Sequence, residues 1–304
     1  MVMENQLIAE IQQLKKEKNA IILAHYYVSD ELQKLADYVG DSFYLAKVAK
    51  STDADVVVFC GVSFMGESAK MLNPEKMVLM PDLTADCPMA HMAQAAKIKE
   101  LREKFEDLAV VCYINSTAEL KSYSDVCVTS SNAVKIVRAL PNQNIFFIPD
   151  VNLGRFVAEQ VPEKNVILND GYCPIHKEIS ATGVQAQKEK YPDALVMAHP
   201  ECEESVLKLA DYIGSTADMI AFAKNSECKT FIVCTEEGVS YRLRQDNPDK
   251  MFYFGGDYCC KDMKLNTLEK VLHVLKTGEN EMKLPADVCE RAVAPLDRML
   301  ELAK

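Results

Sequence analysis

Three segments of this chain repeat one another, and that repeat constrains the fold more than any other feature. AHYY with ADYVGDS, CYINS with SDVCVTSS, and AHPEC with ADYIGST align in order along the chain. In each segment an apolar run ends at a polar residue, and an aspartate follows 12 positions later. The pairs are His25 and Asp37, Tyr113 and Asp125, and His199 and Asp211. This regular spacing predicts three copies of one structural unit.

Each copy alternates strand-like apolar runs with helix-like amphipathic segments. In the first copy the strand-like runs are AIILA, DVVVFCG and KMVLMPD. Five residues after each aspartate a hydroxyl side chain, Ser42, Ser130 or Thr216, precedes an apolar-periodic segment, and we expect that hydroxyl to be the N-cap of a helix. Such alternation predicts parallel sheets with helices on both faces. We therefore expect an α/β fold of three pseudo-threefold-related α/β/α sandwich units with small parallel sheets around a central site.

The repeat also predicts where the units begin and end. We expect the first α/β unit over residues 1–87, the second over 88–173 and the third over 174–260. The remaining segment, 261–304, is predicted to be a helical tail that packs back on the first unit.

A cysteine lies just beyond the third expected strand of every copy. Cys87, Cys173 and Cys260 follow the first polar residue of their copies by 62, 60 and 61 positions. Three thiolates leave one position of a tetrahedral site or of a cubane open, as a catalytic metal centre requires. The spacing fits zinc and an iron-sulfur cluster equally well, and Cys259 competes with Cys260 as a ligand. We expect the other cysteines to be structural.

Polar side chains fall at the expected carboxyl ends of strands, where parallel α/β sheets bind ligands. The equivalent sets are His25, Tyr113 and His199; Tyr27, Asn115 and Glu201; and the three hydroxyls. The helix starts GDS, TSSN and GST offer N–H groups and positive dipole ends to a carboxylate or phosphate. The competing interpretation is that a repeat keeps caps and buried polar groups for structural reasons, and we favour it for the aspartates and hydroxyls taken alone.

The reactive groups in these sets suggest proton transfer. Glu201 is the expected base, with desolvation raising its pKa toward the useful range. Tyr27 and Tyr113 can move protons or orient a substrate oxygen, and His199 lies beside them. His176, three residues after Cys173, is either a neighbour of the metal ligand or a surface residue.

Composition excludes several classes of protein. The net charge of -11, without a basic run, argues against a nucleic-acid partner. No apolar run approaches the roughly 20 residues that span a bilayer, and the N-terminus does not resemble a signal peptide, so we expect a cytoplasmic protein without a membrane partner. The 11 cysteines lie largely within apolar runs, which favours reduced thiols or metal ligands over disulfides.

Motifs along nearly the whole chain resemble the quinolinate synthase family, the A protein of bacterial NAD biosynthesis. The matching segments are HYYVSDELQ (25–33), ADYVGDS (36–42), FCGVSFMGESAK (59–70), CPMA (87–90), YINSTAELK (113–121), TSSNA (129–133), PDVNLG (149–154), GYCPIH (171–176), HPEC (199–202), ADYIGST (210–216), TEEG (235–238) and Cys260 followed by x-x-Met263. The last match favours Cys260 over Cys259. One departure is Asn169, where relatives commonly carry a tryptophan.

The resemblance implies a transferase-like condensing and dehydrating enzyme with a [4Fe-4S] cluster on Cys87, Cys173 and Cys260. Such enzymes condense iminoaspartate with dihydroxyacetone phosphate to quinolinate, releasing phosphate and two waters. L-aspartate oxidase or aspartate dehydrogenase is the implied supplier of iminoaspartate. By the family pattern the substrate pocket is lined by His25, Ser42, Tyr113, Asn115, Ser130, His199, Glu201, Ser215 and Thr216, with Tyr27 and Tyr113 closing over it.

Other functions fit part of the pattern. One is a different three-cysteine [4Fe-4S] hydro-lyase on a small carboxylate, and another is the radical enzyme that makes diphthamide, which has a similar plan. A non-catalytic zinc or electron-transfer module is a third, although an electron-transfer cluster normally has a fourth cysteine. The HYY, HPEC and GST segments fit quinolinate synthase better.

Overall fold

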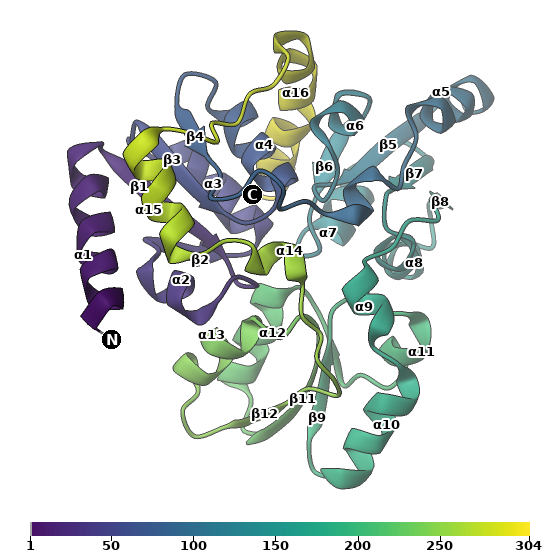
Figure 1. Ribbon diagram of the computed structural model, residues 1–304. Helices are drawn as coiled ribbons and strands as arrows, with labels where there is room; N and C mark the ends of the chain where they lie inside the picture. Colours follow the sequence, from purple (N-terminus) through teal and green to yellow (C-terminus); the bar gives the residue numbers. More distant parts are fainter. Residues whose placement is uncertain (1) are drawn as a thin grey trace.

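The computed structural model describes residues 2–304 and contains three four-stranded parallel sheets (Figure 1). Their strand orders are the same when each sheet is numbered from its own first strand: β2-β1-β3-β4, β6-β5-β7-β8 and β10-β9-β11-β12. Helices alternate with the strands along the chain. The predicted α/β fold with three small parallel sheets is therefore confirmed.

The first sheet and its helices form the N-terminal unit. Its elements are α1 (Val2–Glu17), β1 (Ala20–His25), α2 (Asp30–Leu35), β2 (Tyr38–Gly40), α3 (Ser42–Ser51), β3 (Val56–Cys60), α4 (Ser63–Leu72), β4 (Met77–Leu79) and the 3₁₀ helix η1 (Pro88–His91).

The second and third units repeat this order. The second contains α5 (Ala95–Lys104), β5 (Leu108–Tyr113), α6 (Ala118–Ser122), β6 (Val126–Val128), α7 (Ala133–Ala139), β7 (Asn144–Ile148), α8 (Val151–Gln160), β8 (Asn165–Leu168) and α9 (Pro174–Glu178). The third contains α10 (Ala181–Lys190), β9 (Leu195–Ala198), α11 (Glu204–Leu207), β10 (Tyr212–Ile213), α12 (Thr216–Asn225), β11 (Thr230–Cys234), α13 (Val239–Asp246), β12 (Met251–Tyr253) and α14 (Lys261–Lys264). The short helices η1, α9 and α14, grouped here with the strands that they follow, each begin one residue after the predicted unit boundaries at residues 87, 173 and 260. Those boundaries stay a prediction.

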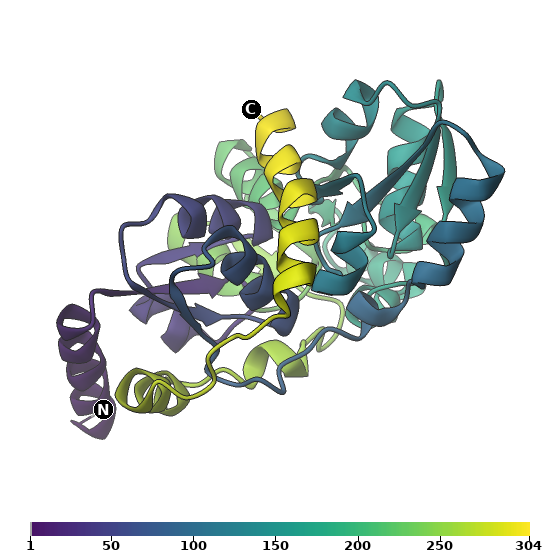
Figure 2. The ribbon, with the colours of Figure 1, turned by 90° about the horizontal axis from the view of Figure 1, so that it is seen from above.

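The tail consists of α15 (Leu268–Thr277) and α16 (Ala286–Leu302). Helix α15 lies beside α1, whereas α16 packs against α4 of the first unit and against α6, α7 and β6 of the second. Figure 2 shows α16, in yellow, running between the two units. The tail therefore contacts the second unit as well as the first.

Each sheet has a short edge strand that the sequence did not reveal. These strands, β2, β6 and β10, have two or three residues and follow the repeated aspartates directly. They are too short to show the alternation of apolar and polar residues by which strands are recognised. Their role is to hold the following helix start at the same end of the sheet as the first strand.

The repeated aspartates have one structural role in all three units. A carboxylate oxygen of Asp37 accepts the N–H of Ile22 at 2.8 Å, that of Asp125 accepts Val110 at 2.7 Å, and that of Asp211 accepts Val196 at 2.8 Å. The aspartate thereby fixes the edge strand to the first strand of its sheet. The structural interpretation of these residues is confirmed.

None of the three predicted hydroxyls is the N-cap of the helix that follows its edge strand. In the second unit the N-cap of α7 is Asn132, not Ser130. In the other two units the cap lies one residue earlier than predicted. Asp41, not Ser42, caps α3 by accepting the N–H of Tyr44 at 2.8 Å. Ser215, not Thr216, caps α12 in a capping box with Asp218. Ser42 and Thr216 are thus not occupied as caps, and both line the cavity described below.

One apolar core extends through the first unit, the second unit and the tail. The third unit has two separate smaller cores. One contains Val196 and Ile232, and the other contains Phe231 and Val233. Because neighbouring residues of a strand point to opposite faces, these two cores lie on the two sides of the third sheet. Within residues 2–304, no helix combines the length and apolar character needed to cross a membrane.

Candidate active site

A cavity of about 510 Å³ lies where the carboxyl ends of strands from all three units meet. Twelve of the thirteen residues singled out from the sequence line it: His25, Tyr27, Ser42, Cys87, Tyr113, Asn115, Ser130, Cys173, His199, Glu201, Thr216 and Cys260. The exception is Ser215, which is fully buried as the cap of α12. Its hydroxyl donates to the Asp218 carboxylate at 2.6 Å, so it belongs to the wall behind the cavity.

The three cysteines have closely similar surroundings. Each is the residue just before a short helix: Cys87 before η1, Cys173 before α9 and Cys260 before α14. Backbone N–H groups of those helices point at the three sulfurs, and they oppose the rise in thiol pKa that burial causes. The arrangement is suited to thiolates, because N–H donors stabilise negative charge on sulfur.

A carboxylate holds the backbone of each cysteine. The acceptors of the cysteine N–H groups are Asp86 Oδ1 for Cys87 (2.8 Å), Asp150 Oδ2 for Cys173 (3.2 Å) and Glu236 Oε1 for Cys260 (3.0 Å). Sequence reasoning missed all three carboxylates. Alignment of the second strands could have found two, because Asp150 and Glu236 occupy the same place after NIFFI and TFIVC, where the first unit has Val62.

Burial raises the pKa of all three thiols. The pKa of Cys260 rises to about 11, and those of Cys87 and Cys173 rise further. The negative charge of neighbouring cysteines adds to this effect for Cys87 and Cys173. Three such thiols become thiolates together only when a positive centre compensates their charge. Three sulfur donors converging on one cavity therefore fit a thiophilic metal centre.

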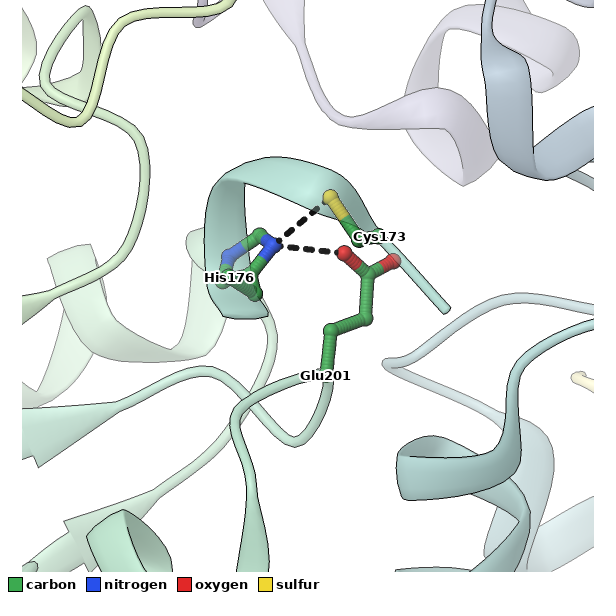
Figure 3. Close-up of side chains that lie close together, drawn as sticks. All are labelled: Cys173, His176 and Glu201. Carbon is green, nitrogen blue, oxygen red and sulfur yellow. Dashed lines mark hydrogen bonds and ion pairs between the residues drawn. The ribbon is translucent and has the colours of Figure 1, made fainter. Parts of the chain in front are cut away.

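Glu201 is buried and receives two hydrogen bonds. The Tyr113 hydroxyl donates to Oε1 at 2.6 Å, and His176 Nδ1 lies 2.7 Å from Oε2 (Figure 3). Burial raises the pKa of the Glu201 carboxyl, but the electrostatic effect of the neighbouring His176 and His199 rings and these hydrogen bonds outweigh burial and lower it. The expectation of a raised pKa was therefore wrong, because sequence reasoning did not foresee two donors at the carboxylate.

His25 and His199 have equivalent positions and equivalent bonds. In each, Nδ1 accepts the backbone N–H two residues later, from Tyr27 at 3.2 Å and from Glu201 at 3.3 Å. Burial lowers the pKa of both imidazoles to about 3, despite the opposing effect of the Glu201 charge. Both rings are therefore neutral, with the proton on Nε2. His199 Nε2 lies 3.2 Å from the Ser130 hydroxyl.

His176 is a buried neighbour of a proposed metal ligand and not a surface residue. Its Nδ1 lies 3.2 Å from Cys173 Sγ, and its ring stacks on His199 with centroids 4.8 Å apart. Cys173, His176 and Glu201 place their ligand atoms within 4.8 Å of one another, close enough to hold a metal ion (Figure 3).

Among the remaining polar groups of the cavity wall, some have hydrogen-bond partners and others do not. The Tyr27 hydroxyl lies 2.8 Å from Thr216 Oγ1 and 2.9 Å from Thr235 Oγ1. Asn115 Oδ1 is buried and has no hydrogen-bond partner within the described residues. A buried amide oxygen without a partner is costly, so Asn115 is an acceptor available to a ligand.

Asn169 lies directly after β8, in the segment that leads to Cys173. Its amide nitrogen donates to the carbonyl oxygens of Met92 at 2.9 Å and Pro149 at 2.7 Å. Hydrogen bonds thus join the segment after η1 to the segment before Cys173.

Comparison with known proteins agrees with this arrangement. The family model described as quinolinate synthetase A protein matches residues 9–301. A protein named quinolinate synthase from Fusobacterium nucleatum is 53% identical over 293 residues, which cover 96% of this chain and 98% of that protein. The quinolinate synthase from Clostridioides difficile is 49% identical, over 99% of this chain and 100% of that protein. The one from Aquifex aeolicus is 50% identical, over 98% of this chain and 94% of that protein. The chain therefore belongs to the quinolinate synthetase A protein family and is an enzyme.

Proposed function

We propose that this enzyme makes quinolinate for NAD biosynthesis by condensing iminoaspartate with dihydroxyacetone phosphate, releasing phosphate and two waters. We further propose a [4Fe-4S] cluster held by Cys87, Cys173 and Cys260. The observation that carries the proposal is that three cysteines in matching positions open onto one cavity, together with neutral imidazoles, hydroxyls and a carboxylate.

The surroundings of the cysteines support this choice of ligands. Cys260 precedes a short helix and donates its N–H to a carboxylate, as Cys87 and Cys173 do. Cys259 lines the same cavity but lacks this arrangement. When bound, a cluster with three protein ligands supplies a Lewis-acidic iron to a substrate hydroxyl or carboxylate.

The cavity offers the donors that anionic substrates need. The hydroxyls of Ser42, Ser130 and Thr216 and the Nε2–H groups of the two neutral imidazoles can donate to carboxylate or phosphate oxygens. None of these groups carries a charge, so substrate binding depends on directed hydrogen bonds and on the N-termini of α3 and α12. Asn115 Oδ1 can accept the N–H of an imine or a substrate hydroxyl.

Proton transfer falls to Glu201, Tyr113, Tyr27 and His199. Glu201 is ionised at neutral pH because its pKa is lowered, and it therefore accepts protons. Tyr113 donates to it directly. Burial raises the pKa of both tyrosines well above the usual value, so both act as hydrogen-bond donors in their neutral form.

The test is iron and sulfide analysis of anaerobically prepared protein, combined with a quinolinate assay. We expect about four iron and four sulfide per chain. Cys87→Ala, Cys173→Ala and Cys260→Ala should each lose the cluster and the activity, while the matched control Cys259→Ala keeps both. Glu201→Gln should keep the cluster and lose most turnover. A full cluster in any of the first three variants contradicts the ligand assignment.

A second candidate is a single metal ion on Cys173, His176 and Glu201, favoured by the mutual distances of their ligand atoms. This site predicts one metal per chain without sulfide, and it predicts that Cys87→Ala retains the metal. The same analysis therefore separates the two sites.

The proposed substrate places the enzyme after one that oxidises aspartate. We propose L-aspartate oxidase or aspartate dehydrogenase as the supplier of iminoaspartate. Coupled turnover from aspartate with either enzyme tests this.

A further inference from the structure

The three loops that follow β1, β5 and β9 carry equivalent side chains into the cavity. Two residues after the first repeated polar residue of each unit lie Tyr27, Asn115 and Glu201, and all three line the cavity. A side chain is held at a fixed place only if the backbone of its loop is held as well. The three loops differ in how this is done.

Two of these loops are held from within their own unit by a buried side chain. In the first unit Gln33 Nε2 donates to the carbonyl oxygens of Tyr26 at 2.8 Å and Val28 at 3.1 Å. In the second unit Lys121 Nζ donates to the carbonyl oxygen of Ser116 at 2.6 Å. Gln33 and Lys121 both lie eight residues after the first polar residue of their units, and both are buried. The repeat therefore places an internal donor behind each of these two loops.

The third loop lacks this internal donor. Its equivalent position, eight residues after His199, is Leu207, whose side chain has no polar group. Among the described residues, one side chain donates to a backbone carbonyl of the loop 199–203, and it comes from another unit. The donor is Asn152 Nδ2 of α8, which lies 3.1 Å from the carbonyl oxygen of Glu201. The second unit thus supplies the support that the third unit does not provide for itself.

The partners of Asn152 fix the orientation of its amide. A guanidinium only donates hydrogen bonds, and a backbone carbonyl only accepts them. Arg155 Nη1 donates to Asn152 Oδ1 at 3.2 Å, so Nδ2 is the atom that faces the carbonyl oxygen of Glu201. Asn152 is 6% exposed and does not line the cavity. It therefore contacts Glu201 without contacting a substrate in the cavity.

The start of α8 holds a proposed metal ligand and the proposed base at once. Asp150, the N-cap of α8, accepts the N–H of Cys173 at 3.2 Å. Asn152, two residues later, bonds the backbone of Glu201. Because both contacts come from one helix turn, they set the position of Glu201 relative to Cys173. The N–H of Glu201 donates to His199 Nδ1, so the peptide groups on both sides of this residue are bonded.

The joint between the third and first units uses the same two positions. Glu236, equivalent to Asp150, accepts the N–H of Cys260 at 3.0 Å. Two residues later, the carbonyl oxygen of Gly238 accepts from Gln33 of the first unit at 3.0 Å. In both joints a helix start that holds one cysteine also supports the cavity-lining loop of the next unit. This recurrence indicates that the contact serves the site.

We propose that Asn152 is a positioning residue for Glu201: its amide replaces the internal donor that the third loop lacks and fixes the Glu201 backbone relative to Cys173. This inference rests on the proposed function, in which Glu201 accepts protons. Tyr113 and His176 hold the side chain of Glu201, whereas Asn152 holds its main chain. A residue outside the cavity thus contributes to turnover.

The kinetic test uses Asn152→Leu, which keeps the approximate size of the side chain and removes the amide. Asn165→Leu is the matched control, because it removes an amide of the same unit at the amino end of β8, away from the cavity. We expect kcat to fall about 10- to 100-fold in Asn152→Leu, with KM within about threefold of the wild type, because the base is misplaced. Asn165→Leu should keep kcat within about twofold. Wild-type kcat in Asn152→Leu, or equal losses in the two variants, would overturn the proposal.

A double-mutant cycle tests whether Asn152 acts through Glu201. Glu201→Gln already removes the base, so adding Asn152→Leu to it should lower the remaining kcat less than about threefold. A further loss as large as the one that Asn152→Leu causes alone would show that Asn152 acts elsewhere. That result would contradict the proposal.

Hydrogen exchange of the full chain gives a test that needs no activity. The N–H groups of Glu201 and Cys202 are bonded within the third loop, to His199 Nδ1 and to the His199 carbonyl oxygen. Asn152→Leu should raise the exchange rate of residues 199–203 at least about fivefold. Residues 25–29 and 113–117 should keep their wild-type rates, because their internal donors remain. Unchanged exchange at 199–203, or an equal rise in all three loops, speaks against Asn152 as the support.

A wild type that makes no quinolinate contradicts only the proposed function, because hydrogen exchange still measures the support of the third loop. Iron analysis accompanies the kinetics of Asn152→Leu. We expect the iron content of the wild type, whereas loss of iron would assign the lower turnover to Cys173 and overturn the role at Glu201. If Asn152→Leu does not fold, Asn152→Ala takes its place in all of these tests.

Discussion

The joint between the first and second units differs in chemistry from the joint that holds the third unit. Helix α16 fills the first joint with Ala292, Pro295, Leu296 and Met299, which are buried between α4 and the α6 region. One apolar core continues through both units (Figure 2). Apolar contact of this kind is strong and undirected.

The third unit is held largely by polar groups. Gln33 and Lys264 bind its loops to the Tyr27 segment, and the Tyr27 hydroxyl reaches Thr216 and Thr235. The rings of Tyr26 and Tyr27 provide the apolar part of this contact. Hydrogen bonds add little net stability but fix orientation. Two of these groups, Tyr27 and Thr216, also line the candidate active site.

The largest effect on stability is expected from a substitution that weakens the apolar joint between the first and second units. Leu296→Ala should lower the free energy of unfolding by about 2–5 kcal/mol, because it leaves a cavity in the shared core. Urea unfolding of the whole chain measures this. The exposed neighbour Glu290→Ala is the control and should change little. A loss of less than about 1 kcal/mol in the free energy of unfolding for Leu296→Ala would show that α16 does not stabilise the contact between the two units.

A matched substitution in the polar joint, which holds the third unit, should lower the stability less than Leu296→Ala does and lower the activity more. Gln33→Met keeps the volume but removes the three hydrogen bonds to carbonyl oxygens. We expect about 1–3 kcal/mol of destabilisation from the carbonyls left unpaired. Turnover should fall in the same variant because Tyr27 loses its support. Full activity in Gln33→Met would contradict the role of this joint in the site.

The polar joint should also be sensitive to acid. The pKa of His199 is about 3 in the folded chain against 6.5 for a free imidazole, because it is buried. Between these values the unfolded state binds a proton that the folded state does not, so stability falls as pH falls. One such group contributes a slope of about 1.4 kcal/mol per pH unit. His199→Gln should reduce the slope of stability between pH 6 and pH 4 by about this amount. The control His273→Gln, at an exposed position, should leave it unchanged.

The smallest effect is expected from removal of an exposed ion pair beside the apolar joint. Lys50 of α3 pairs with Asp297 of α16, and both side chains are 40% or more exposed. Asp297→Asn should cost less than about 0.5 kcal/mol, because exposed ion pairs contribute little. Thermal unfolding at low and at high salt checks this. A cost above about 1 kcal/mol would mean that α16 is held by charge as well as by apolar contact.

Much of the candidate site could be predicted because it follows from local repetition. Cys87, Cys173 and Cys260 each follow the third strand that the sequence predicts for their unit, and the loops that bear them lie at one end of their sheets. The aspartate that bonds the first strand, such as Asp37, recurs at constant spacing for the same reason. Each of these features depends on contacts within a single unit.

The sequence by itself thus determined the three parallel sheets, three of the four strands in each and the residues at their carboxyl ends. Only the tertiary structure decided that Glu201 has a lowered pKa, that His176 is buried and that Asn152 bonds the backbone of Glu201 from another unit. It also decided that α16 bridges two units. The physical reason is that these properties arise between residues far apart in the sequence, such as Tyr27 and Thr235. Their energies depend on how the units meet, which no local pattern encodes.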